Sequence, residues 1–369
     1  MVTGAPRFCS RRTVCELSRG ADNPRNSEGC FARLRDGSLL FAYSRYRGDV
    51  GEDDSPCEIA GLISRDGGLS FEPLPAPLVS AAAHGAENVM SPSLARLPNG
   101  ELALFYLCKY PPCSAYYMRK ALGADETRFG EALCVIPRED GVYYVVNNAR
   151  VQTLSDGRVL VPAARHRVVR RPDGTPDAAY YAESLLYVGD PDGQGWRRLP
   201  RVFRLPRRGR SETGLQEPGV LQLPDGSLYL YFRTDRCFQY ESVSSDGGVR
   251  WSVPDASRFT SPDSPMLLTR DPFSGRVFAF WNPTPNFNGR LPENGPWISA
   301  GRTPFVMAVS ADGFRFSSYT VLGEEPDRGY CYPAAFFTDA DTLLLSYCCG
   351  GPEDGTCLTR TVIERIVLQ

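Results

Sequence analysis

The sequence predicts an all-β protein built from repeated hairpins, and three observations lead to that prediction. First, a short turn motif occurs three times, as SRDGGLSF at 64–71, SSDGGVRW at 244–251 and a shorter SADGFRF at 310–316. Second, runs of β-branched and aromatic residues flank turns of the Asp-Gly and Asn-Gly type, which favour hairpins because these residues accept positive φ. Third, helical periodicity is weak throughout the chain.

The hairpins recur along the whole sequence at a spacing of roughly 50–70 residues. Their turn positions are Gly37, Gly100, Gly157, Gly226, Gly275 and Asp341. Each interval also holds further strand-like sequence, such as EIAGLIS before the first turn motif, which makes about four strands per unit. Four-stranded units in series are typical of propeller blades. We therefore expect a six-bladed β-propeller with four-stranded antiparallel blades.

The whole chain, residues 1–369, is expected to form one domain, because no linker divides it. The expected blades span roughly 24–78, 79–137, 138–205, 206–260, 261–323 and 324–369. The last strand, RTVIERIVL, is expected to share its sheet with an N-terminal strand near RTVCELS. That pairing would close the last blade and hide its edge.

Composition narrows the possible partners. The net charge is −2 and no long basic run is present, so nucleic acid is not expected. No apolar stretch is long enough to span a membrane, and no signal peptide is apparent. Twelve cysteines without a Cys-x-x-Cys, and only two histidines, favour free thiols in the cytoplasm over a zinc site. No metal or cofactor is expected. A secreted, disulfide-bonded chain is the alternative, and the oligomeric state is not indicated.

The turn motif itself is interpreted as scaffold. Asp66 and Asp246 are expected to accept hydrogen bonds from turn amides, and Gly68 and Gly248 to take positive φ. The motif would join the last two strands of a blade and contact no substrate.

Function is expected where equivalent segments converge on the axis. The residues nine positions before each turn should lie at the start of an innermost strand, on one side of the ring. They are Glu28, Ser91, Asn148, Glu217, Met266 and Tyr332. Five of these six are polar, which favours a polar pocket.

The second strand of the hairpin returns to the same side, and in five of the hairpins it carries four cationic residues and one asparagine there. The residues there are Arg45, Lys109, Arg165, Arg233 and Asn282. Glu217 and Arg233 flank one turn at similar distances, so they should be neighbours. They would form either a plain ion pair at the rim or part of a cationic pocket for an acidic ligand, which the planar fork of arginine suits.

These residues resemble the sialidase (neuraminidase) superfamily with its Asp-box repeats. The resemblance covers nearly the whole chain through the repeat, and four segments extend it: QEPGVLQLPDGSLYLYFR, GRTPFVMAVSADG, GYCYPAAFF and GEDDSPCEIAGLISRDGG. It implies Glu217 as partner of a tyrosine nucleophile, with Arg233 and Arg302 binding a carboxylate. The nucleophile is Tyr332 by its distance from the turn or Tyr330 by its Gly-Tyr context. The implied acid/base is Asp54 rather than Asp53.

The first blade departs from the family pattern. Arg25, in PRNSEGCF, lies farther from its turn than the arginine of that pattern, and Glu28 stands where a cation is wanted. Arg25 or Arg45 would have to compensate that carboxylate. Asn88, Asn148 and Arg150 also lie near the mouth, where they would contact sugar hydroxyls or satisfy loop backbone. His84 and His166 are expected near the same mouth, where each would be a solvated loop residue or, as the alternative, a group for acid–base work.

The resemblance implies an exo-glycosidase that releases a terminal sialic acid, or a related acidic sugar, from a small glycoside or oligosaccharide with retention of configuration. The alternatives are a glycosidase or lyase for another glycan, a carbohydrate-binding propeller without catalysis, and a scaffold for protein partners.

Overall fold

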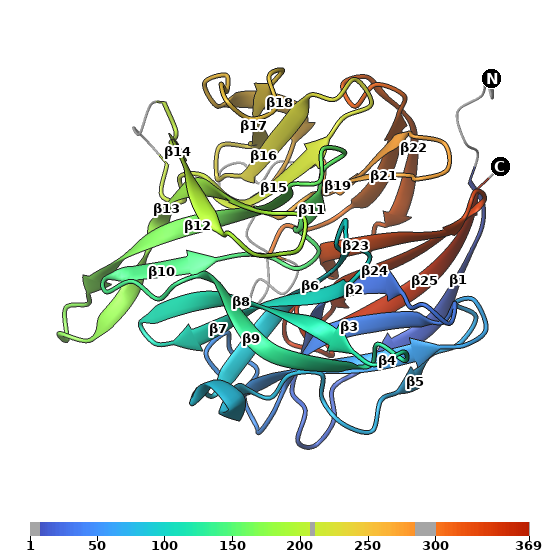
Figure 1. Cartoon of the computed structure of the whole chain (residues 1–369), viewed down its shortest axis with the longest axis horizontal. Helices are drawn as coiled ribbons and strands as arrows, with labels where there is room; N and C mark the ends of the chain where they lie inside the picture. Colours follow the sequence, from blue (N-terminus) through green and yellow to red (C-terminus); the bar gives the residue numbers. More distant parts are fainter. Residues whose placement is uncertain (1–7, 207–210, 285–299, 369) are drawn as a thin grey trace.

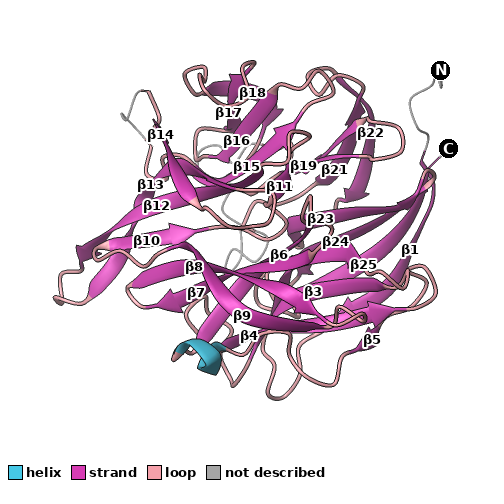
Figure 2. Ribbon diagram, in the orientation of Figure 1, coloured by secondary structure: helices cyan, strands magenta, loops and turns pink. Residues whose placement is uncertain are grey.

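The computed structural model describes residues 8–206, 211–284 and 300–368. Strands form nearly all of its regular structure, together with one short 3-10 helix, η1 (Ala81–His84) (Figure 2). The prediction of an all-β protein is confirmed. Within these residues no helix has the length and apolar character needed to cross a membrane.

The largest sheet contains the first two hairpin units. Its strands are β2 (Asn26–Arg33), β3 (Leu39–Tyr46), β4 (Cys57–Ser64), β5 (Glu72–Pro73), β6 (Asn88–Arg96), β7 (Leu102–Tyr110), β8 (Cys113–Leu122) and β9 (Arg128–Ile136). All neighbours are antiparallel except β4 and β6, which meet at one parallel bridge between Cys57 and Asn88. The sheet is therefore two antiparallel meanders, β2–β5 and β6–β9, joined at one point.

Three further sheets follow in chain order. The second contains β10 (Val142–Val145), β11 (Gln152–Thr153), β12 (Val159–Arg170), β13 (Pro176–Gly189) and β14 (Arg197–Phe203). The third contains β15 (Gln216–Gln222), β16 (Leu228–Arg233), β17 (Phe238–Ser244) and β18 (Asp255–Thr260). The fourth contains β19 (Leu267–Arg270), β20 (Val277–Trp281), β21 (Phe305–Ser310) and β22 (Phe316–Gly323). Consecutive strands lie side by side in each, except that β10 and β11 both pair with β12 and not with each other.

The last sheet joins the two ends of the chain. Its order is β1 (Phe8–Leu17), β25 (Arg360–Leu368), β24 (Thr342–Gly350) and β23 (Gly329–Asp339). β1 pairs antiparallel with β25, with Thr13 opposite Glu364, so the predicted pairing of the terminal segments is confirmed. β1 and β25 lie side by side at one side of the molecule (Figure 1). β1 covers the edge of β25 that would otherwise be unpaired.

The innermost strands touch one another in sequence. β2 contacts β6, β6 contacts β11, β11 contacts β15, β15 contacts β19, and β19 contacts β23. β23 in turn contacts β2 (Figure 1). Each strand at or near a predicted mouth residue therefore contacts the next one in this series, although the residues are widely separated in sequence.

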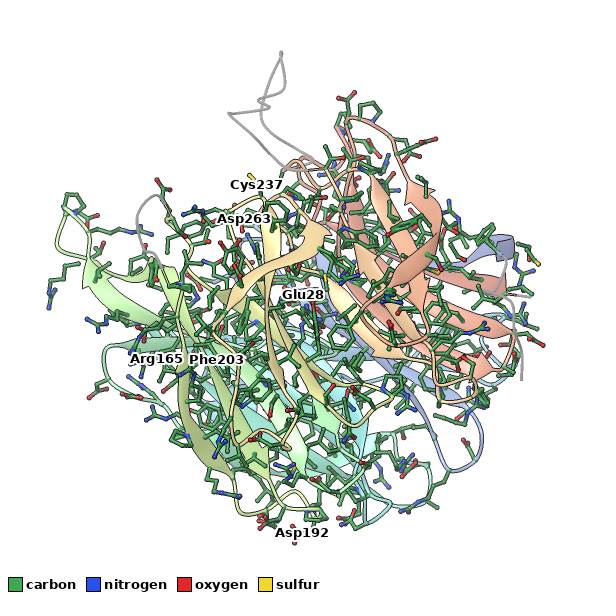
Figure 3. All side chains as sticks on the ribbon, turned by 90° about the horizontal axis from the view of Figure 1, so that it is seen from above. Glu28, Arg165, Asp192, Phe203, Cys237 and Asp263 are labelled. Atoms are coloured by element: carbon green, nitrogen blue, oxygen red, sulfur yellow. The ribbon has the colours of Figure 1, made fainter. Side chains whose placement is uncertain are left out.

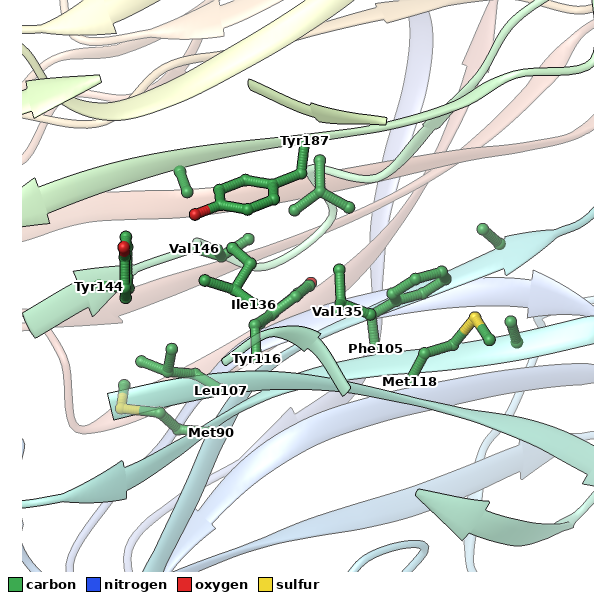
Figure 4. Close-up of a cluster of buried hydrophobic side chains, with 14 of the residues drawn as sticks. Met90, Phe105, Leu107, Tyr116, Met118, Val135, Ile136, Tyr144, Val146 and Tyr187 are labelled. Carbon is green, nitrogen blue, oxygen red and sulfur yellow. The ribbon is translucent and has the colours of Figure 1, made fainter. Parts of the chain in front are cut away.

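Apolar side chains fill the space between adjacent sheets. One cluster packs Met90, Phe105 and Tyr116 of the first sheet against Tyr144 and Tyr187 of the second (Figure 4). These side chains are at most 6% exposed. Burying a large apolar side chain contributes about 1.5–3 kcal/mol, so these contacts hold neighbouring sheets in place.

The repeated turn motif has the scaffold geometry expected for it. Asp66 Oδ1 accepts hydrogen bonds from the amides of Leu69 and Ser70, both at 3.0 Å. Gly68 has a φ of 88°, and a Cβ there would lie 2.7 Å from Leu344 Cδ1 of the terminal sheet. The motif therefore closes a turn and also brings one sheet close to the next, which only glycine permits.

Removing one of these turn carboxylates is expected to affect stability alone. Asp246 Oδ1 accepts hydrogen bonds from the amides of Val249 and Arg250, at 3.1 and 2.8 Å. Asp246→Ala should lower the thermal midpoint by a few degrees, because both amides lose their acceptor. A smaller decrease is expected for Asp192→Ala, since Asp192 accepts only the Gln194 amide. Thermal unfolding followed by circular dichroism measures both. Equal midpoints for wild type and Asp246→Ala would contradict the scaffold role.

Candidate active site

The innermost strands begin with a bulge whose backbone is left-handed. Glu28, Ser91, Glu217 and Tyr332 have φ of 55°, 54°, 42° and 51°. Register shifts in the strand pairings surround each of them. In the segment before β11 the left-handed residue is Ala149, which follows the predicted mouth residue Asn148. Positive φ is unfavourable for these side chains, and a bulge re-aims a side chain, so such strain is typical of functional positions.

The central pair of the site is Tyr332 and Glu217. Tyr332 Oη donates to Glu217 Oε1 at 3.0 Å. The two residues lie in the first halves of β23 and β15, which belong to different sheets, so the bond spans the space between the sheets. Burial raises the pKa of Tyr332 well above its usual range, and the Glu217 carboxylate adds to that effect. The phenol therefore stays protonated and has a base within hydrogen-bond distance.

Tyr330, the other candidate nucleophile, lies elsewhere. Its ring is 4% exposed and stacks on Phe305, with centroids 6.1 Å apart and planes at 9°. It belongs to the apolar cluster between the last two sheets. The bulge between Cys331 and Ala334 places Tyr332, and not Tyr330, beside Glu217.

Arg233 joins this pair to a second carboxylate. Its Nη1 lies 2.9 Å from Glu217 Oε2, which confirms that the two predicted neighbours meet. Its Nε and Nη2 donate to the two oxygens of Asp263, at 2.6 and 3.0 Å. Glu217 and Arg233 are both 9% exposed, so they are not a solvated pair at the rim. A guanidinium held by two carboxylates is strongly fixed in position.

Arg302 is a buried cation with unused donors. Its Cζ lies over the Tyr332 ring, 5.6 Å from the ring centroid, and the residue is 7% exposed. Its Nη1 donates to Cys357 Sγ at 3.8 Å, while its Nε has no hydrogen-bond partner. Among the described residues no carboxylate forms an ion pair with it. A buried guanidinium in this state favours an anionic ligand.

Arg302 borders a cluster of thiols. Cys331, Cys348 and Cys357 pack together beside it, and none of the three forms a disulfide. For these three cysteines the prediction of free thiols is confirmed. Burial, together with the contact to Cys348, raises the pKa of Cys331 to about 12, so this thiol remains neutral. The cluster therefore contributes no negative charge next to Arg302.

Arg25 lies in the same site and is compensated by acidic neighbours. Its Nη1 is 2.7 Å from Asp53 Oδ1 and its Nη2 is 3.7 Å from Glu28 Oε1. Glu28 also accepts a hydrogen bond from Ser91 Oγ at 2.7 Å. The cation predicted to offset Glu28 is thus Arg25.

Enclosure by the pocket walls opposes ionisation of Asp53, but Arg25 and Lys109 outweigh it and lower its pKa. The Asp53 side chain is 67% exposed, so solvent also favours its charge.

Asp54 faces a different cation. Its Oδ1 lies 3.3 Å from Lys109 Nζ, and its side chain is 71% exposed. It borders a cleft of about 270 Å³ that Asn88, Lys109, Tyr110 and Arg138 also line. The two consecutive aspartates therefore point to different parts of the mouth.

Two predicted asparagines support the backbone. Asn88 Nδ2 donates to the carbonyls of Asp53 and Ser55, at 3.0 and 2.6 Å, and so holds the loop that carries both aspartates. Asn148 Nδ2 donates to the carbonyl of Gly29 at 2.8 Å and to that of Tyr332 at 3.3 Å. These amides were expected either to contact sugar hydroxyls or to satisfy loop backbone. Both amide nitrogens donate to backbone carbonyls.

The structure does not bring Arg45 and Arg165 to the site. Arg45 Nε donates to Glu58 at 2.8 Å, and Arg165 Nη2 lies 2.7 Å from Glu183. Ser44 and Tyr46 face Ser91 and Arg25, so Arg45, between them on β3, points to the opposite face of the sheet. Figure 3 shows Arg165 well to one side of Glu28.

Arg150 and Met266 lie deeper than the mouth. Arg150 Nη2 donates to the Met266 carbonyl at 2.6 Å, and its Nη1 donates to Tyr231 Oη at 3.0 Å. Arg150 lines a cavity to which none of Glu217, Tyr332 and Arg302 contributes. Asn282 is a support, since its Nδ2 donates to the Arg302 carbonyl at 2.9 Å.

Neither histidine has a solvated loop position. His84 Nε2 lies 2.7 Å from Tyr106 Oη. His166 is 8% exposed, its Nδ1 lies 2.8 Å from the Ala179 carbonyl, and burial lowers its pKa. The expectation of a solvated residue is wrong for His166, which β12 buries beside Tyr143. His84 is half-buried at the end of η1, with its ring against Tyr117.

Asp263 is the site residue that the sequence analysis missed. It holds Arg233 and accepts a hydrogen bond from Tyr180 Oη at 2.8 Å. An available signal was its position in SPDSP, shortly before the start of β19 at Leu267, next to the innermost strand. In the described ranges no group of three or more His, Cys, Asp or Glu side chains is arranged to hold a metal ion.

The charge on Glu28 should appear in the pH dependence of stability. Burial raises the pKa of Glu28, and Arg25 only partly opposes this. A carboxyl whose pKa is higher in the folded state binds more protons when folded, so the free energy of unfolding falls as the pH rises through that pKa. Glu28→Gln keeps an acceptor for Ser91 without the charge. Its stability relative to wild type should therefore improve from about pH 4 to about pH 8 in urea unfolding. If the free energy of unfolding of Glu28→Gln instead falls relative to that of the wild type as the pH rises, this prediction is wrong.

The fold and this site can be set beside known proteins. The family model described as a BNR repeat-like domain matches residues 75–344. A protein of unknown function from Dyadobacter fermentans has a similar structure (TM-score 0.71, 16% identity, 97% of this chain and 99% of that chain). So does the NanB sialidase of Streptococcus pneumoniae, with a TM-score of 0.68 and 11% identity over 96% of this chain and 70% of that chain. The α-L-arabinanase of Penicillium chrysogenum is also similar, with a TM-score of 0.63 and 13% identity over 98% of this chain and 99% of that chain. No curated protein matches significantly. Since the family model covers most of the chain, the protein belongs to the BNR repeat-like domain family.

Proposed function

We propose that this protein is a retaining exo-glycosidase of sialidase type, which releases a terminal sialic acid or related acidic sugar with Tyr332 as nucleophile. The observation that carries the proposal is the buried Tyr332–Glu217 pair, with the unpaired Nε of Arg302 beside it. A lectin needs no base on a buried phenol. The unbroken series of contacts between innermost strands, from β2 to β23 and back to β2, supports a closed ring of six blades in one domain.

Binding would rest on the three arginines at the mouth. Arg302 offers a free Nε, and Arg25 and Arg233 are held within the same site by Asp53 and Asp263. A carboxylate on the anomeric carbon would receive charge-assisted hydrogen bonds from these guanidinium groups. Such a substrate also repels an anionic nucleophile, so a neutral phenol is a suitable attacker.

The first chemical step would use Glu217 as the base. As Tyr332 Oη attacks the anomeric carbon, its proton passes to Glu217 Oε1, which already accepts its hydrogen bond. The glycosidic bond breaks, and the leaving oxygen takes a proton from an acid on the opposite side. The product is a covalent glycosyl-tyrosine. Water, deprotonated by that same acid group in its carboxylate form, then attacks the anomeric carbon. The bond to Tyr332 Oη breaks, Glu217 returns the proton to the phenol, and the sugar leaves with retention.

We assign the acid/base role to Asp53, with Asp54 as the alternative that the sequence favoured. Asp53 contacts Arg25, whereas Asp54 contacts Lys109. Arg25 lowers the pKa of Asp53 in the free protein, which disfavours the protonated acid. A substrate carboxylate that engages Arg25 would weaken this attraction. The pKa of Asp53 would then rise, and the group would become an acid when substrate is bound.

A second candidate function is hydrolysis of a neutral glycoside. It is favoured by the carboxylates already paired with Arg25 and Arg233, which compete with an acidic substrate. The arabinanase of similar fold shows that acidic sugars are not the only ligands of comparable proteins. The two functions differ in the substrate that turns over.

Activity measurements with matched tyrosine variants test the proposal. A fluorogenic sialoside and a panel of neutral aryl glycosides are the substrates. Tyr332→Phe should lower kcat on the sialoside by at least about 10²–10⁴-fold, because it removes the nucleophilic oxygen. Tyr330→Phe removes the same atom from an apolar cluster and should leave kcat nearly unchanged.

The aspartates are distinguished in the same assay. Asp53→Asn should lower kcat/KM by about 10²–10⁴-fold, and Asp54→Asn by much less. The reverse order would move the acid/base role to Asp54. Turnover of neutral glycosides alone would reject the acidic substrate, and full activity of Tyr332→Phe would reject the mechanism.

The role of Arg302 can be tested by a substitution that keeps its positive charge and removes the planar guanidinium. Arg302→Lys keeps the charge but loses the planar fork, so kcat/KM for the sialoside should fall about 10–100-fold. Arg45→Lys is the control, since Arg45 pairs with Glu58 on the other face of β3. Equal effects of the two substitutions would contradict carboxylate binding by Arg302.

A further inference from the structure

We infer that the cavity around Arg150, between the innermost strands, is a binding site for a small inorganic anion of the halide class. This cavity, of about 110 Å³, is lined by residues from β11, β15, β16, β19 and β23 and by the segment before β11. Val220 and Ala335 lie three positions beyond Glu217 and Tyr332 on their strands, so the cavity is farther along the axis than the proposed active site.

The first support is the charge of Arg150. Its side chain is 4% exposed, and no carboxylate among the described residues forms an ion pair with it. Its Nη1 and Nη2 donate to Tyr231 Oη and the Met266 carbonyl, and its Nε is buried without a partner. Arginine does not lose its proton in proteins, and an uncompensated buried charge is costly. Neutral acceptors alone leave that charge unbalanced.

The second support is Tyr231. Its hydroxyl accepts hydrogen bonds from Arg150 and from the Leu268 amide at 3.2 Å, and no described residue accepts the phenolic proton. That proton is therefore available to an anion in the cavity that Tyr231 lines. The ring can occupy this position only because residue 219 is glycine. A Cβ on Gly219 would lie 2.1 Å from Tyr231 Cζ.

The remaining lining decides the class of anion. Val151, Val220, Leu267, Leu268 and Ala335 are apolar, so few donors are available besides Arg150, Tyr231 and Thr269. Gln152 also lines the cavity, but its Nε2 already donates to the Thr153 carbonyl at 2.8 Å. Phosphate or sulfate carries more charge and needs more donors to replace its hydration. A monovalent halide needs fewer. A volume of about 110 Å³ accommodates such an ion together with water, since one water molecule takes about 30 Å³.

Crystals of the full chain grown in sodium bromide test the inference by anomalous diffraction. We expect a bromide peak in the cavity, within hydrogen-bond distance of Arg150 Nε and Tyr231 Oη. The peak should persist in Tyr332→Phe, which separates this site from the proposed catalysis. It should weaken in Tyr231→Phe, which keeps the ring and removes the donor. Bromide at surface sites only, with water or nothing in the cavity, would overturn the inference.

Thermal unfolding gives a second readout that does not depend on crystals. At matched ionic strength, a tenfold rise in chloride should raise the wild-type midpoint by about 1–3 °C, whereas gluconate is too large for the cavity and should not. Arg150→Met should lose this chloride dependence. If Arg150→Met does not fold, Tyr231→Phe serves in its place with a reduced shift. Equal responses of the wild type to chloride and gluconate would refute the site.

Discussion

The left-handed bulge at the start of the innermost strands is the constraint on which the site depends. It occurs at Glu28, Ser91, Glu217 and Tyr332, none of which is a residue that accepts positive φ easily. Such strain persists only where the surroundings fix it, and here sheets on both sides of each strand do so. Because the bulge recurs at equivalent depth, side chains from separate sheets meet, as Tyr332 and Glu217 do.

The mouth is organised by a balance of buried charge. Arg25 and Arg233 are each held by acidic side chains, whereas Arg302 retains an unpaired Nε over the Tyr332 ring. Paired arginines are fixed in position, and an unpaired one supplies the attraction for a ligand. The same reasoning distinguishes Arg150, whose cavity lies between the same strands but has no nucleophile in its lining.

Particular residues show how far sequence reasoning reached. Counting from the turns placed Glu217 beside Arg233 and Tyr332 at the mouth, because hairpin geometry is local and regular. The same counting put Arg45 and Arg165 at the mouth, where the structure does not bring them. Each lies on a strand face that points away, and side chains alternate between faces with every residue. Asp263 was missed because it lies in a loop, where no period specifies direction.

The sequence by itself determined the all-β fold, the repeated hairpins, the pairing of the two chain ends and the scaffold role of the Asp-Gly turns. These follow from short-range rules of alternation, turn chemistry and edge protection. Only the tertiary structure decided that Tyr332 rather than Tyr330 meets Glu217, that Arg25 compensates Glu28, and that Arg150 lies in a cavity of its own. Those contacts join residues that are distant in sequence or depend on a one-residue bulge, and no local pattern encodes either.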